Sequence, residues 1–75
     1  MMFDKVKEIL SKYTEAESIT EDVSLTQDLM LTSLEVVSMV GDFEDVFDIE
    51  IADEEIMKMK TVGDILEYLK KQGIE

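Results

Sequence analysis

The stretch TSLEVVSMVGDFEDVF, residues 32–47, decides the fold of this 75-residue chain. Its first four residues form a capping box. In this motif Thr32 accepts a hydrogen bond from the backbone N–H of Glu35, and the Glu35 carboxylate accepts one from the backbone N–H of Thr32. The apolar residues that follow share one helical stripe: Val36, Met39, Val40, Phe43, Val46 and Phe47. This spacing predicts a helix that begins at Ser33, runs to about Phe47 and forms the central wall of the core.

The N-terminal segment predicts a first helix over residues 2–14, because its apolar side chains recur at helical spacing. These side chains are Phe3, Val6, Ile9, Leu10 and Tyr13. Residues 15–32 follow as a long first loop, which is too aperiodic for a helix and too apolar for a free linker. Ser24, with Gln27 three residues on, indicates a short turn inside this loop, which Leu25 and Leu29 would tie to the core.

The C-terminal part of the chain predicts two further helices. Asp53 is expected to cap a brief helix over residues 54–59. Thr61 and Asp64 form a second capping box, which opens a last helix that ends before Gly73. The inward side chains of this last helix are Val62, Ile65, Leu66 and Leu69.

Residues 48–52 alternate isoleucine with acidic residues, as a strand would. No partner strand is predicted, so we interpret them as a connection between helices. The chain is therefore predicted to be all-α, a small bundle of three main helices and one short helix with a long first loop. It would form a single domain over residues 1–75, which must fold on a compact helical core because it has no cysteine for disulfides.

The composition excludes most kinds of chemistry. The chain contains no Cys and no His, so it lacks a thiol nucleophile, a zinc–thiolate site and the usual general base. We therefore expect no catalytic residue and a protein that is not an enzyme. No apolar run approaches the roughly 18 residues of a membrane span, and the N-terminus lacks the features of a signal peptide. We expect a cytoplasmic protein without membrane insertion.

The charge of the chain is concentrated in its middle. Residues 21–57 contain twelve acidic and no basic side chains, whereas the net charge is −1 over residues 1–20 and +1 over residues 58–75. A total net charge of −12 repels nucleic acid and anionic membranes and favours encounters with basic partners. Because a merely solvated surface usually mixes both signs, we interpret the middle segment as a surface that faces a partner.

A divalent metal is the first alternative for so acidic a chain, but the spacing of an EF-hand loop is absent. With Asp42 as the first ligand, Val46 takes the fifth position and Phe47 takes the position of the required glycine. The twelfth position holds Asp53 in place of glutamate. We expect weak, diffuse cation binding and no dedicated metal site.

Ser33 is the candidate site residue. It stands at a helix N-terminus after a long loop, where backbone N–H groups and the positive end of the helix dipole favour a phosphate. An isolated serine at this place would be ordinary helix-start chemistry, but its surroundings favour a functional site. Leu34 and Val37 are apolar without a clear core role by periodicity. Acidic side chains follow on the helix surface: Glu35, Asp42, Glu44 and Asp45.

Several short motifs recur in a characteristic order along the chain. They are Ile19-Thr20-Glu21-Asp22, Asp28-Leu29, Ser33-Leu34, Phe43-Glu44-Asp45 with Phe47, Glu50-Ile51, Asp53-Glu54-Glu55 and Thr61-Val62-Gly63-Asp64. No single motif is strong. Together with the acidic second helix and the absence of cysteine, their order and spacing resemble those of acyl carrier proteins over nearly the whole chain.

The resemblance implies that Ser33 carries 4'-phosphopantetheine, which a separate phosphopantetheinyl transferase transfers from coenzyme A. The terminal thiol of this arm would hold an acyl chain as a thioester, and the core helices would part to admit that chain. Acyl-processing enzymes would read the acidic helix with basic patches. Their contacts would be Glu35, Asp42, Glu44 and Asp45, with Leu34, Val37 and Ile51 as apolar contacts near the arm. We expect the carrier to be a monomer.

The sequence departs from the family's usual Asp-Leu-Gly-x-Asp-Ser-Leu around the serine. Met30 takes the place of the glycine, and Thr32 replaces an aspartate that transferases commonly contact. Ala52 replaces a frequent proline. These differences favour a specialised carrier, in fatty-acid or related lipid or polyketide biosynthesis, over the housekeeping fatty-acid carrier. The alternative is an unmodified acidic interaction module of the same fold, which binds a basic partner protein through residues 21–57.

Overall fold

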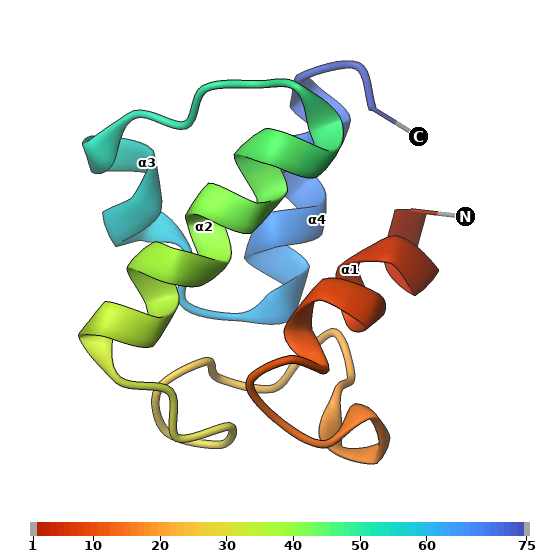
Figure 1. The fold of residues 1–75 in the computed structure, drawn as a ribbon, viewed down its shortest axis with the longest axis vertical. Helices are drawn as coiled ribbons and strands as arrows, with labels where there is room; N and C mark the ends of the chain where they lie inside the picture. Colours follow the sequence, from red (N-terminus) through yellow and green to blue (C-terminus); the bar gives the residue numbers. More distant parts are fainter. Residues whose placement is uncertain (1, 75) are drawn as a thin grey trace.

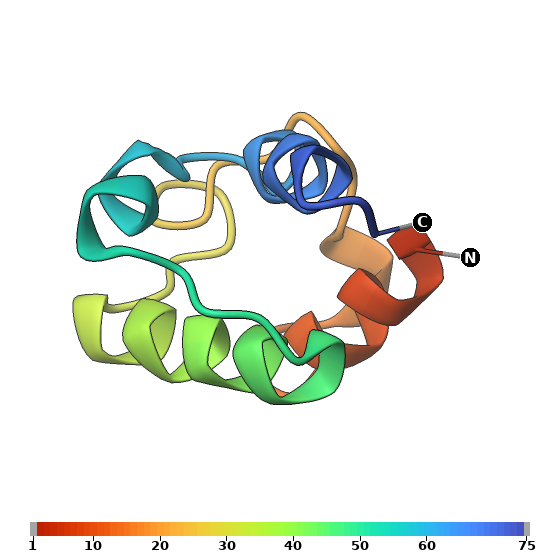
Figure 2. The same cartoon turned by 90° about the horizontal axis from the view of Figure 1, so that it is seen from above.

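The computed structural model describes residues 2–74, and this part of the chain contains four α-helices. They are α1 (Met2–Leu10), α2 (Ser33–Phe47), α3 (Asp53–Lys58) and α4 (Val62–Lys71), with one 3-10 turn at Ala16–Ser18. Seen from above, α2 lies along one side of the molecule, α3 and α4 lie on the opposite side, and α1 closes one end (Figures 1 and 2). The prediction of three main helices, one short helix and a long first loop is confirmed.

The start of α2 follows the predicted capping box. Thr32 Oγ1 accepts a hydrogen bond from the Glu35 N–H at 3.1 Å, and Glu35 Oε1 accepts one from the Thr32 N–H at 2.8 Å. The helix ends after Phe47 at Asp48, whose φ of 55° is left-handed and whose N–H bonds the carbonyl of Glu44. Aspartate tolerates this conformation better than most residues, so local chemistry sets where α2 begins and ends.

The prediction that Val46 faces the core is wrong, because its side chain is 48% exposed. Three residues along a helix turn the side chain by roughly 300°, which puts Val46 at the edge of the stripe on which Phe43 is central. Phe47, which is partly buried, continues the core-facing row instead. Its ring stacks on the ring of Phe43 with the centroids 6.2 Å apart.

Helix α1 ends at Leu10, four residues before the predicted end. The chain continues in tighter turns, in which the N–H of Lys12 bonds the carbonyl of Ile9 and the N–H of Tyr13 bonds that of Leu10. These turns bring the end of α1 to α2. There the Tyr13 hydroxyl donates to the Asp42 carboxylate at 2.6 Å, and Lys12 Nζ lies 3.8 Å from the same carboxylate.

The predicted cap of α3 is also corrected. The residue that caps the helix is Ala52, which has no side chain to bond the backbone, and Asp53 is already the first helical residue. The connection that leads into α3 is held one residue before Ala52. Ile51 is buried there, and its N–H donates to the Glu44 carboxylate at 2.8 Å. The acidic first turn still faces the positive end of the helix dipole.

Helix α4 begins with the predicted capping box. Asp64 accepts hydrogen bonds from the N–H groups of Lys60 and Thr61 at 2.9 and 3.0 Å, and these bonds lower the pKa of its carboxyl group. After α4 the chain turns at Gly73, whose φ of 83° favours glycine.

One hydrophobic core connects all the helices and the first loop. Its largest fully buried side chains are Val6, Leu10, Leu25, Met39, Phe43, Val62, Ile65 and Leu69. The loop is held against α4, since the N–H of Leu25 bonds the carbonyl of Lys60 at 2.9 Å and the N–H of Val62 bonds the carbonyl of Val23 at 3.2 Å. The predicted turn is present, with the Gln27 N–H bonded to Ser24 Oγ at 3.1 Å.

Strand pairing between residues 2 and 74 is limited to one isolated bridge, between Ser24 and Thr61. Residues 48–52 form no strand, as expected. In the same described part, no helix combines the length and the apolar character needed to cross a bilayer.

Candidate functional site

Ser33 is exposed and is the first residue of α2. Its hydroxyl group makes no hydrogen bond to any residue between 2 and 74. The capping box uses the N–H groups of Thr32 and Glu35, so the N–H groups of Ser33 and Leu34 remain without a partner in this part of the chain. An oxygen atom attached to Ser33 would therefore meet two free donors at the positive end of a helix.

An open groove of about 660 Å³ lies beside Ser33. It runs between the first loop, the N-terminal half of α2 and α3. Its lining residues are Ser24, Leu25, Thr26, Gln27, Ser33, Val36, Val37, Ile56, Met57, Met59 and Lys60. Much of this lining is aliphatic or thioether side chain, which can adapt to a flexible guest. The groove is therefore an open and largely apolar surface directly beside the Ser33 hydroxyl.

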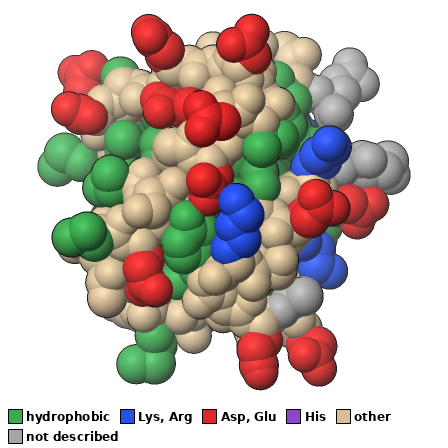
Figure 3. Space-filling model, viewed as in Figure 1, with side chains coloured by type: hydrophobic (Ala, Val, Ile, Leu, Met, Phe, Trp, Pro, Cys, Tyr) green, Lys and Arg blue, Asp and Glu red, His purple; other side chains and the backbone are tan. Residues whose placement is uncertain are grey.

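Exposed apolar side chains surround this region. They are Met30 and Leu34, each 78% exposed, Val37 at 61% and Met57 at 80%. Figure 3 shows hydrophobic groups protruding over α3, the N-terminal half of α2 and the loop before it. The exposure of Leu34 and Val37 agrees with the sequence pattern. The position of Met57 was not predicted, although Ile56 and Met59, three residues apart, mark the inward side of this short segment and leave Met57 off it.

Three of the four acids predicted to face partners are bonded within the chain. Glu35 belongs to the capping box, Asp42 accepts from Tyr13 at the end of α1, and Glu44 accepts from Ile51. Asp45 is exposed, and its carboxylate makes no hydrogen bond or ion pair with any described residue. Of the four, Asp45 is thus the one whose carboxylate is entirely free.

The prediction that Ile51 is an apolar surface contact is wrong. Its side chain is only 7% exposed and belongs to the core. The reason is the bond from the Ile51 N–H to Glu44, which draws the connection between α2 and α3 inward at this residue. The apolar contacts available near Ser33 are therefore those of α2, α3 and the preceding loop.

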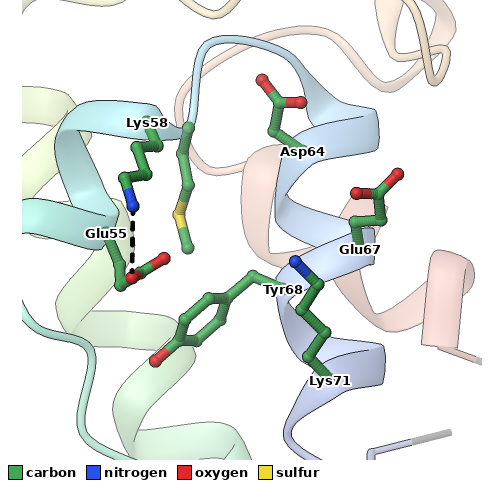
Figure 4. Close-up of a pocket in the computed structure, with 7 residues that line it drawn as sticks. Glu55, Lys58, Asp64, Glu67, Tyr68 and Lys71 are labelled. Carbon is green, nitrogen blue, oxygen red and sulfur yellow. Dashed lines mark ion pairs between the residues drawn. The ribbon is translucent and has the colours of Figure 1, made fainter.

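A second, smaller pocket of about 130 Å³ lies between α3 and α4 (Figure 4). Charged side chains of both signs dominate its lining: Glu55, Lys58, Asp64, Glu67 and Lys71, with Met59 and Tyr68. Glu55 and Lys58 form an ion pair at 3.8 Å. No three acidic side chains of the described residues converge into a metal-binding group.

The groups with shifted pKa values lie away from Ser33. The hydrogen bond from Tyr13 to the Asp42 carboxylate raises the pKa of Tyr13 to about 12. A hydrogen bond from the Thr20 hydroxyl lowers the pKa of Asp22. Neither residue lines the groove, and the site itself offers an accessible hydroxyl and an adaptable surface.

Comparisons with known proteins agree with this geometry. Residues 4–69 match the protein family described as "Phosphopantetheine attachment site". The chain is 38% identical over 73 residues to the acyl carrier protein of Thermotoga maritima, covering 95% of this chain and 90% of that protein. A solved structure described as an acyl carrier protein of Mycobacterium tuberculosis superimposes with a TM-score of 0.89 at 27% identity, covering 96% of this chain and 99% of the other.

Proposed function

The chain belongs to the acyl carrier protein family, whose members carry phosphopantetheine and are not themselves enzymes, and we propose that Ser33 is the attachment residue in this protein. The protein is thus a carrier, and its partners include an acyl chain and the enzymes that process it. The observation that carries the assignment of Ser33 is its exposed, unbonded hydroxyl at the start of α2, on the rim of the groove.

Other serines fit the role less well. The hydroxyl of Ser11 donates to the carbonyl of Glu8 at 2.6 Å, and the hydroxyl of Ser24 accepts from the N–H of Gln27. Ser38 is exposed, but it lies inside α2, where backbone N–H groups are used by the helix, and it does not line the groove. Ser18 is exposed, but it lies in the 3-10 turn at Ala16–Ser18 and does not line the groove. Ser33 combines access, two free N–H donors and the groove.

The residues around Ser33 suit the cofactor. Its Oγ would form the phosphodiester, and the free N–H groups of Ser33 and Leu34 would favour the negative charge of the phosphate. The bound group supplies a terminal thiol, on which acyl chains are held as thioesters; the chain itself has no cysteine. The groove, with Met57 and Met59 in its lining, would receive part of the arm or of the acyl chain.

We further propose that the carrier serves a specialised branch of fatty-acid, lipid or polyketide biosynthesis, as a monomer. Thr32 supports this proposal, because its hydroxyl still caps α2 through the N–H of Glu35 while it leaves no carboxylate at the position before Ser33. A transferase suited to this carrier must accept that change. The acidic surface, with Asp45 as its free carboxylate, would be met by basic patches on the transferase and on acyl-processing enzymes.

The proposal is tested by loading the purified protein. We expect incubation with coenzyme A and a broad-specificity phosphopantetheinyl transferase to add one phosphopantetheine to the intact mass. The gain should be lost in Ser33→Ala and kept in Ser38→Ala, the matched exposed serine on the same helix.

A mass gain that persists in Ser33→Ala would place the attachment elsewhere. If several transferases add nothing to the wild-type protein, the unmodified interaction module is the better description.

A further inference from the structure

Met30 has a backbone conformation that is unusual for its residue type. Its φ is 59°, in the left-handed region that residues with a β-carbon rarely adopt. Aspartate and asparagine can offset this strain with their short polar side chains, whereas methionine cannot. Such strain persists only where the surrounding structure enforces it.

The two residues on either side of Met30 hold its backbone in this conformation. Leu29 and Leu31 are both buried in the core. Their N–H groups bond the carbonyls of Ser24 and Leu25 at 3.0 and 2.9 Å. The chain must therefore reverse at position 30 to bury both leucines, and a glycine would make this reversal without strain. The fold does not require a methionine here.

The Met30 side chain is also unused by the core, because it is largely exposed. Its Cα lies three residues before that of Ser33, hence within roughly 11 Å of it. Leu34 and Val37 on α2 and Met57 on α3 are also exposed apolar side chains, and Figure 3 shows separate hydrophobic groups protruding on this side of the molecule. Val37 and Met57 line the same groove as Ser33, and exposed apolar side chains gathered beside one groove favour an interaction site.

Resting on the proposed role of Ser33, we propose that Met30 docks into an apolar pocket of the phosphopantetheinyl transferase and determines which transferases accept this carrier. A transferase must close around the Ser33 hydroxyl, and at this short distance it covers position 30 as well. Enzymes that act on the acyl chain contact the far end of a flexible arm, so they need not cover position 30. Because residues 21–57 carry acidic side chains and no Lys or Arg, basic groups of the transferase would flank the pocket.

The experiment compares loading kinetics of Met30→Leu, Met30→Ala and Met30→Gly, using the transferase that loads the wild-type protein. We expect Met30→Leu to keep kcat/KM within about twofold, since its side chain is of similar size and apolarity. Met30→Ala and Met30→Gly should both lose about tenfold, mainly through KM, as expected for a buried interface anchor. Val46→Ala is the matched control, because it removes exposed apolar surface at the other end of α2 and should load normally.

The variants also separate the side chain from the backbone. Helix content by circular dichroism and stability in urea are measured for each, and Met30→Gly should be at least as stable as Met30→Ala because glycine relieves the strain. Normal loading of both small variants would overturn the role of Met30 and leave that of Ser33 intact. Recovery of loading in Met30→Gly alone would assign the effect to backbone strain.

A defect confined to acyl transfer from the loaded carrier would overturn the assignment of the transferase as the partner. Failure of the wild-type protein to load at all would contradict the role of Ser33, and the role of Met30 with it.

Discussion

Glu44 and Asp42 illustrate how acidic residues of this protein serve the fold. Glu44 accepts the N–H of Ile51 at 2.8 Å, and Asp42 accepts the hydroxyl of Tyr13 at 2.6 Å. Charge-assisted hydrogen bonds of this kind are among the stronger ones. Replacing either acid would disturb the packing of α2 on its neighbours, whereas Asp45 can be changed without such a loss. Tests of partner recognition should therefore begin with Asp45.

The hydrogen bond between Tyr13 and Asp42 makes the stability of the protein sensitive to pH in the alkaline range. Because the fold raises the pKa of Tyr13 from 10.0 to about 12, it favours the neutral phenol. Its contribution is complete below pH 10 and is lost as the pH rises toward 12. We expect Tyr13→Phe to lower the free energy of unfolding by about 1 kcal/mol at neutral pH, since the bond is only partly buried.

The measurement is urea unfolding of both proteins, with the difference shrinking at pH values between 10 and 12. Tyr68→Phe is the control, because the Tyr68 hydroxyl makes only a long bond, 3.4 Å, to the carbonyl of Glu50. A stability difference that stays constant over this range would contradict the assigned pKa.

At the scale of elements, α2 and α3 differ in how they are stabilised. Helix α2 has a complete capping box and a left-handed C-cap, and it buries Met39, Val40 and Phe43. Helix α3 has six residues, no side-chain cap and no fully buried residue. The wall of the groove formed by α3 is therefore the less firmly held one, which would suit the proposed entry of the arm or of an acyl chain.

The weak point of α2 is Gly41 in its interior. A β-carbon at this position would meet no atom within 4 Å. We expect Gly41→Ala to stabilise the protein by about 1 kcal/mol through helix propensity, which raises the melting temperature by roughly 4–8 °C for a domain of this size. Thermal unfolding followed by circular dichroism measures the effect.

Gly63→Ala is the opposite case and serves as the control. Its β-carbon would lie 3.0 Å from the carbonyl oxygen of Glu21, which already accepts the Gly63 N–H at 2.7 Å. This variant should be destabilised. A lower melting temperature for Gly41→Ala would show that position 41 requires glycine for another reason.

At the scale of the whole molecule, charge is the dominant property. The net charge is −12, and only two ion pairs occur in the part of the chain that the structure describes, Lys12 with Asp42 and Lys58 with Glu55. Most acids therefore repel one another without compensation. Repulsion destabilises the folded state, and the same field attracts basic partners.

Salt should therefore affect stability and loading in opposite directions. Raising the ionic strength from about 0.01 to 0.15 M shortens the screening length from about 30 to 8 Å. We expect the melting temperature to rise and the rate of Ser33 loading to fall, because screening weakens both repulsion and steering. Asp45→Lys should slow loading at low salt while leaving helix content unchanged. Loading rates that do not depend on salt would contradict an electrostatic contact.

The sequence by itself determined where α2 and α4 begin and which serine stands at the start of α2. The capping boxes of Thr32 and Thr61 join groups three residues apart, so their chemistry is local and can be read from the chain. The exposure of Leu34 and Val37 could also be predicted from the sequence, because helical periodicity alone separates them from the stripe of Phe43.

Only the tertiary structure decided which acids are free, where α1 ends and which isoleucine is buried. Asp42 is occupied because Tyr13, 29 residues away, meets it at the end of α1. Ile51 is buried because Glu44 draws its backbone inward. The strain at Met30 arises because two leucines on either side of it must both reach the core. Each of these outcomes depends on which surfaces distant in the chain come together, and spacing within one helix carries no information about that.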